Sequence, residues 1–133
     1  MKKNKLYVLI ISVTAIAAML WNALSEPGIK GLKGNLKETS FIRNEQNTGP
    51  VIRIYAISID QEYWTDMEQY GNYMPHNKYG TTRVYFFLSN KPYKGKLELT
   101  GSNIEEEYKQ YCIGLYEKNG MSQSSIIKYP FRN

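Results

Sequence analysis

Four side chains that could perform acid–base or metal chemistry lie close together in this 133-residue chain. Asp60, Glu62 and Asp66 are followed by His76, which is the single histidine. Carboxylates beside an imidazole can transfer protons or hold a divalent cation. A simpler interpretation is that Asp60 caps a helix while Glu62 and Asp66 lie on its solvated side. A small hydrolase or metal-binding protein is therefore an alternative, and not the favoured function.

Nucleophilic chemistry has still less support. Cys112 is the only cysteine and lies in YKQYCIGLY, among apolar neighbours that favour a buried side chain. A nucleophilic thiol needs a base, and no motif connects Cys112 with His76. The chain has no G-x-S-x-G, H-E-x-x-H, Gly-rich phosphate loop or paired C-x-x-C. We therefore predict no catalytic residue, no cofactor and no metal ligand.

The stretch DQEYWTDMEQYGNYMPHNKYG, residues 60–80, is the best candidate for a binding site. Its five large aromatic residues are Tyr63, Trp64, Tyr70, Tyr73 and Tyr79. They could be core residues of a helix that caps the end of a sheet, or they could form a contact surface. Each ring can bury about 150–250 Å², so together they could offer about 1,000 Å² to a partner. Tyr and Trp favour a protein partner, and a glycan or cell-wall polymer is the alternative because the same rings can stack on sugars.

Local spacing predicts the element that carries these rings. Tyr63, Met67 and Tyr70 recur at helical spacing, Asp60 is placed to cap the first turn, and Gly71 is placed to end the last one. We expect a short amphipathic helix over residues 61–70 and a loop over residues 71–80.

The remaining pattern is that of strands separated by turns. We predict strands over residues 36–43, 51–59, 81–89, 109–117 and 124–131. VIRIYAISI, residues 51–59, is apolar on both sides, which predicts a central strand. Residues 81–100 are expected to form a hairpin that turns Leu97 and Leu99 toward the core. Residues 102–116 also fit a helix starting at Ser102, and Asn119-Gly120 favours a hairpin turn.

These elements indicate an all-β fold, or a β-rich α+β fold, of five or six strands. We expect a small antiparallel sandwich or open barrel with one short helix near 61–70, preceded by an N-terminal hydrophobic helix. Residues 1–25 are predicted to be a signal peptide or membrane anchor, residues 26–35 a tether, and residues 36–133 an extracytoplasmic domain.

The prediction of export depends on the 19 uncharged residues from Leu6 to Leu24, which follow Lys2, Lys3 and Lys5. Such a run is long enough to span a bilayer, and the lysines place the N-terminus in the cytoplasm. Cleavage near Ser25 would release a secreted domain. Without cleavage, the helix would anchor the domain in the inner membrane, facing the periplasm or the extracellular side.

Charge gives no reason to expect a nucleic-acid partner. Without the three lysines of the leader, 14 basic residues face 12 acidic ones. A nucleic-acid site would need a basic patch on the folded domain, which this near balance does not predict.

Overall fold

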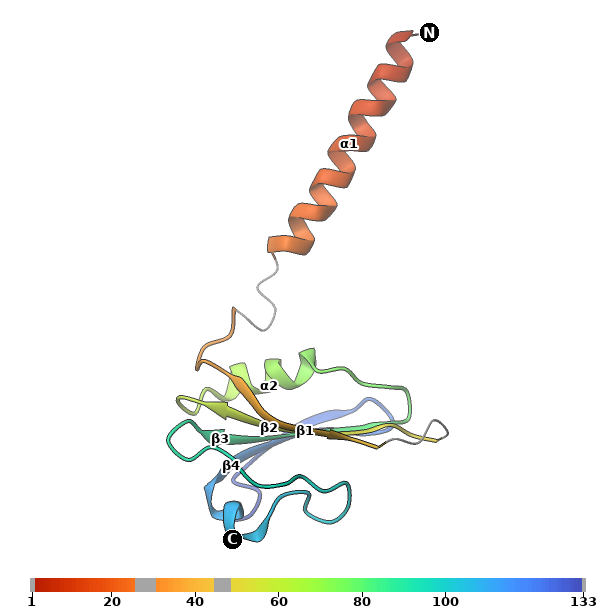
Figure 1. Ribbon diagram of the computed structural model, residues 1–133. Helices are drawn as coiled ribbons and strands as arrows, with labels where there is room; N and C mark the ends of the chain where they lie inside the picture. The colour runs from red at the N-terminus through yellow and green to blue at the C-terminus, as the bar shows by residue number, and fades with distance from the viewer. Residues whose placement is uncertain (1, 26–30, 45–48, 133) are drawn as a thin grey trace. The chain divides into compact units, whose positions relative to one another are not determined.

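The computed structural model describes residues 2–25, 31–44 and 49–132 (Figure 1). The chain divides into two compact units, Met1–Gly31 and Leu32–Asn133. Of the tether predicted over 26–35, residues 26–30 lie outside the described part. Residues 32–36 belong to the domain: Leu32 and Leu36 pack against its core, and the Asp60 amide donates a 2.8 Å hydrogen bond to the Gly34 carbonyl.

The first unit contains α1, a helix of 24 residues at Lys2–Ser25. Its stretch Lys3–Trp21 is long and apolar enough to cross a membrane, and none of that stretch is buried within the structure. By length and composition, α1 is compatible with either a signal sequence or a membrane anchor.

The second unit is built on one open sheet of five strands: β1 (Lys37–Arg43), β2 (Ile52–Ile59), β3 (Thr81–Leu88), β4 (Cys112–Lys118) and β5 (Ser124–Lys128). Their order across the sheet is their order in the sequence. Every neighbouring pair is antiparallel except β2 and β3, which are parallel. The strands predicted near 36–43, 51–59, 81–89, 109–117 and 124–131 are present, and the β-rich α+β class is confirmed.

The predicted antiparallel sandwich or barrel is wrong. Parallel β2 and β3 need a crossover connection, and α2 (Trp64–Tyr73) supplies it. Figure 1 shows α2 on one face of the sheet and residues 89–111 on the other. A helix and an irregular segment therefore cover the faces that a second sheet would cover in a sandwich.

The predicted hairpin over residues 81–100 is also wrong. Both edges of β3 are occupied, by β2 and by β4, so residues 95–101 cannot pair with it. They cross one face of the sheet as irregular chain, with Leu97 buried and Leu99 half-buried. The alternation of apolar and polar residues correctly predicts that one side of this segment is buried, although the segment is not a strand.

Asn103 holds this irregular segment on the sheet. Its buried side-chain oxygen accepts hydrogen bonds from the Tyr85 hydroxyl at 2.6 Å and from Arg83 at 3.0 Å. Its side-chain nitrogen donates to the Glu98 carbonyl at 2.8 Å. The 3₁₀-helix η2 (Glu106–Tyr111) then leads into β4, so residues 102–116 contain a short helix as well as a strand.

The helix predicted over 61–70 exists but is displaced toward the C-terminus, and neither predicted cap is correct. Tyr63 occupies the N-cap position without a side-chain hydrogen bond, so Asp60 does not cap α2. Gly71 lies within α2, because its lack of a side chain lets the helix approach the buried ring of Tyr116. Gly71 therefore permits close packing between α2 and β4.

Candidate functional site

The structure does not bring together the carboxylates and the histidine of the first stretch. The Glu62 carboxylate accepts a hydrogen bond from the Tyr129 hydroxyl, and Asp66 accepts one from the Lys33 amide. His76 follows the opposite end of α2. Within the described residues, no three His, Cys, Asp or Glu side chains are grouped as a metal site would require.

Cys112 and His76 lie on opposite faces of the sheet. Cys112 belongs to the core beneath residues 89–111, whereas His76 bonds to Thr82 on the face that α2 covers. Burial raises the pKa of the Cys112 thiol to about 12, against weaker opposing effects of the Gly114 and Phe86 backbone. The group therefore stays protonated at neutral pH, and a protonated thiol is a poor nucleophile.

The five aromatic residues of the predicted surface are divided by the fold. Tyr70 is core: its ring meets Phe86 edge to face at 6.3 Å, and burial raises its pKa to about 12. Tyr63 and Trp64 are half-buried near the start of α2, where Trp64 lies edge-on to Tyr129 with ring centroids 5.9 Å apart. Tyr73 and Tyr79 are exposed, by 48% and 66%.

His76 fixes the loop that carries Tyr79. Its Nε2 lies 3.1 Å from the Asn119 carbonyl, which can only accept, so Nε2 carries a proton. In the neutral ring Nδ1 then accepts from the Thr82 hydroxyl at 2.8 Å. Burial is the main cause of a lowered His76 pKa, with the nearby positive charge of Lys118 as a second cause. The histidine predicted as a possible acid–base group thus joins residues 74–80 to the β4–β5 turn.

A second hydrogen bond supports the same loop. Arg53 on β2 donates from Nη2 to the Asn77 side-chain oxygen at 2.9 Å. The Asn77 carbonyl accepts from the Gly80 amide at 2.9 Å, which closes the turn through Lys78 and Tyr79. Tyr79 has φ of 64°, a left-handed conformation that the turn imposes. The ring of Tyr79 is therefore displayed on a hydrogen-bonded support.

Met121 extends this exposed end of the domain. It lies in the β4–β5 turn, is 80% exposed, and follows Gly120, which packs against the backbone of Tyr79. We name the pair Tyr79 and Met121 the Tyr79–Met121 surface. Met121 was not among the predicted site residues, although a large apolar residue inside a predicted hairpin turn could have indicated an exposed contact.

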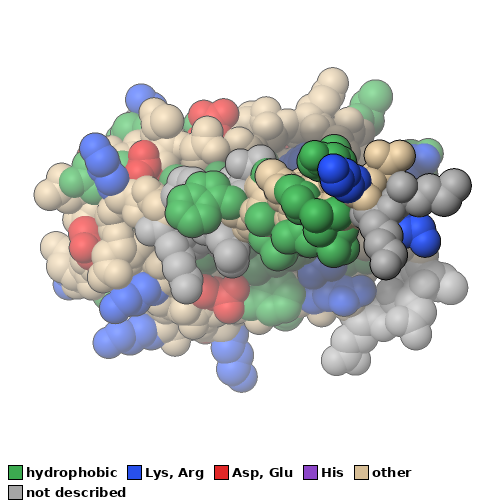
Figure 2. Space-filling model, turned by 90° about the horizontal axis from the view of Figure 1, so that it is seen from above, with side chains coloured by type: hydrophobic (Ala, Val, Ile, Leu, Met, Phe, Trp, Pro, Cys, Tyr) green, Lys and Arg blue, Asp and Glu red, His purple; other side chains and the backbone are tan. Residues whose placement is uncertain are grey.

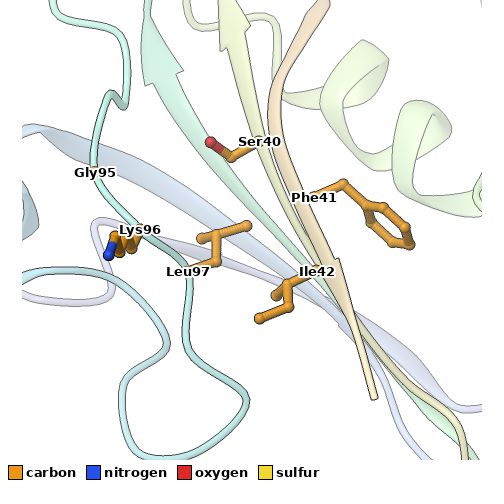
Figure 3. Close-up of a pocket in the computed structure, with 6 residues that line it drawn as sticks. All are labelled: Ser40, Phe41, Ile42, Gly95, Lys96 and Leu97. Atoms are coloured by element: carbon orange, nitrogen blue, oxygen red, sulfur yellow. The ribbon is translucent and has the colours of Figure 1, made fainter. Parts of the chain in front are cut away.

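A separate hollow of about 380 Å³ lies beside the edge strand β1. Its lining residues are Ser40, Phe41, Ile42, Gly95, Lys96 and Leu97. Figure 3 shows the side chains of Ser40, Ile42 and Leu97 on one side of β1, and Phe41 pointing to the other side. We name this hollow the β1 groove.

Charge on the domain is dispersed. In the view of Figure 2, Lys and Arg side chains are scattered over the visible surface, and Asp and Glu side chains lie among them. This view shows no continuous basic field of the kind that tracks a phosphate backbone.

The fold and these surfaces define a small β-rich α+β domain behind an N-terminal apolar helix. No protein-family model, curated protein or solved structure matches this chain. A proposal for its function therefore rests on its own residues.

Proposed function

We propose that this protein is an extracytoplasmic interaction module that binds a protein partner through the Tyr79–Met121 surface. The observation that carries the proposal is the exposure of two large apolar side chains on loops that hydrogen bonds hold in place. Tyr and Met are both enriched where protein surfaces meet. A supported loop also loses little conformational freedom on binding, so more of the contact energy remains as affinity.

Location outside the cytoplasm is part of this proposal. It is supported by α1, whose stretch Lys3–Trp21 is long and apolar enough to cross a membrane, and by the three lysines that precede the uncharged run from Leu6 to Leu24. The mature protein is then either anchored by α1 in the inner membrane or released by cleavage near Ser25. Mass spectrometry of the N-terminal residue distinguishes the two forms.

Site-specific photo-crosslinking in the full chain tests the interaction. A photoreactive residue at position 79 or 121 should crosslink to the same protein, whereas one at exposed Gln110 should not. With that protein purified, the double variant Tyr79→Ser/Met121→Ser should bind it at least about tenfold more weakly, a loss of roughly 1.4 kcal/mol or more. Equal affinity of a folded double variant would refute the assignment of this surface.

A glycan ligand is the second candidate because of a different hollow. An open hollow of about 280 Å³ lies between residues 90–94 and η2, where Tyr108 and Tyr111 are among its lining residues. The Lys91 ammonium lies 5.3 Å from the centre of the Tyr111 ring. Aromatic rings beside a cation suit an anionic sugar. If this candidate is correct, an acidic-polysaccharide column should retain the protein, and Tyr111→Ala should abolish that retention.

A further inference from the structure

The edge of the sheet at β1 is only half protected against pairing with another strand. Within the described residues, β2 is the one strand that pairs with β1. Lys37 and a bulge between Glu38 and Ser40 interrupt the first half of the strand, and these are devices that discourage edge-to-edge association. The second half, from Ser40 to Arg43, has no proline and no bulge.

This unprotected half presents apolar groups on both faces of the sheet. On the face that α2 covers, the Phe41 ring stacks on Tyr55 with centroids 4.7 Å apart and is still 44% exposed. On the other face, Ser40 and Ile42 line the β1 groove opposite Leu97. An added strand would therefore find an apolar neighbour above the sheet and a hollow below it.

We propose that β1 pairs with β1 of a second copy of this chain, antiparallel and with the two-fold axis at Phe41. In that register Phe41 faces Phe41 of the second copy, and Ser40 faces Ile42 of the second copy. The two exposed rings then cover one another. Each Ile42 enters the groove of the other copy beside Ser40. This inference concerns a different surface from the Tyr79–Met121 surface and does not depend on the proposed partner.

The charged side chains of β1, and the face of the sheet on which they lie, both favour this register. Glu38 pairs with Ile57 and Arg43 with Arg53, so both side chains are on the α2 face. A two-fold axis at Phe41 brings Arg43 near Glu38 of the second copy, which is an attractive pair. An axis at Ser40 would instead set Phe41 against the bulge between Glu38 and Ser40, so the two exposed rings would no longer cover one another.

We infer that the added strand belongs to a second copy because the β1 edge is self-complementary. Phe41 of each copy can cover Phe41 of the other, and Ile42 of each copy can fill the β1 groove of the other. Such an isologous contact closes as a dimer. Pairing would be confined to the half of β1 from Ser40 to Arg43, so each copy would bury much less than the roughly 800 Å² that each partner gives to a standard interface. We therefore expect a weak dimer whose population depends on local concentration.

Disulfide crosslinking in the full chain tests this pairing at its natural concentration. Directly opposed residues of an antiparallel ladder have Cα atoms about 4.5–5.5 Å apart, within the range of about 4.4–6.8 Å that a disulfide spans. Phe41→Cys should give a covalent dimer under mild oxidation. Ile127→Cys is the matched control, because Ile127 is 46% exposed on the other edge strand, β5. Buried Cys112 is present in every variant and should contribute no dimer.

The register has its own test. Ser40→Cys and Ile42→Cys chains, expressed together, should form a mixed dimer at least about threefold more than either chain forms alone. The variant Phe41→Lys should abolish the dimer that an amine crosslinker captures with the native chain. The proposal is overturned if Phe41→Cys dimerises no more than Ile127→Cys. It is equally overturned if Phe41→Cys links preferentially to Ile127→Cys, because β1–β5 pairing would build open chains.

Discussion

Replacing Gly71 with alanine is the sharpest test of how α2 is positioned. A Cβ atom at Gly71 would lie only 2.5 Å from both Cδ atoms of the Tyr116 ring. Carbon atoms in favourable contact are about 3.5–4.0 Å apart, so the ring or the helix must move by about an ångström. Tyr116 is fully buried, and its hydroxyl donates a 2.7 Å hydrogen bond to Asn72 on α2. The ring therefore has little freedom to withdraw.

Two opposing contributions set the expected magnitude. Alanine within a helix is favoured over glycine by about 1 kcal/mol. Overpacking a core typically costs about 1–3 kcal/mol, and the upper half of this range applies because the clash involves the ring near its attachment to β4. We expect Gly71→Ala to lower the free energy of unfolding by about 1–2 kcal/mol. Urea denaturation followed by near-ultraviolet circular dichroism measures this change.

A double-mutant cycle isolates the clash. In a Tyr116→Ala background the ring is absent, so Gly71→Ala should become neutral or stabilising, with a coupling of at least about 1 kcal/mol. Gly101→Ala is the control, because Gly101 has φ of 67° and a Cβ atom there would have no neighbour within 4 Å. It should show backbone strain without coupling to Tyr116. Stabilisation by Gly71→Ala in the native background would refute the reasoning.

Three further outcomes are expected. Burial and Lys118 lower the His76 pKa below its usual 6.5, so the unfolded chain binds more protons than the folded one as the pH decreases. The free energy of unfolding should therefore fall as the pH decreases below 6.5. Denaturation curves of His76→Gln should show a weaker dependence on pH. Asn103→Ala should lower the free energy of unfolding, measured by urea denaturation, by about 2–4 kcal/mol, because the Tyr85 hydroxyl and the Glu98 carbonyl lose their hydrogen-bond partner. A loss below about 1 kcal/mol would contradict the anchoring role of Asn103. Cys112 should react with a thiol reagent only on unfolding, and rapid reaction in the native protein would contradict its burial.

Local patterns were sufficient to predict the five strands that form the sheet. VIRIYAISI is apolar on both sides, and the structure places it as β2, with β1 and β3 on either side and residues packed on both faces. The signal at Asn119-Gly120 correctly predicted the β4–β5 hairpin. These features depend on residues that are neighbours in sequence. The alternation of side chains along a strand and the residue types in a turn are therefore sufficient to predict them.

Local patterns did not predict which strands pair with one another. Residues 95–101 alternate like a strand, but β3 pairs with β2 and β4 instead. That outcome is a competition between distant segments for the same backbone groups, and the alternation of one segment does not reveal its competitors.

The candidate site shows the same division. The sequence by itself determined that residues 60–80 are rich in aromatic residues, that one histidine follows them, and that an apolar leader precedes the domain. Only the tertiary structure decided that Tyr70 is core while Tyr79 is exposed beside Met121, and that His76 holds a loop in place. The physical reason is that exposure depends on which segments pack together, and the β4–β5 turn meets the loop of Tyr79 only after the sheet has formed.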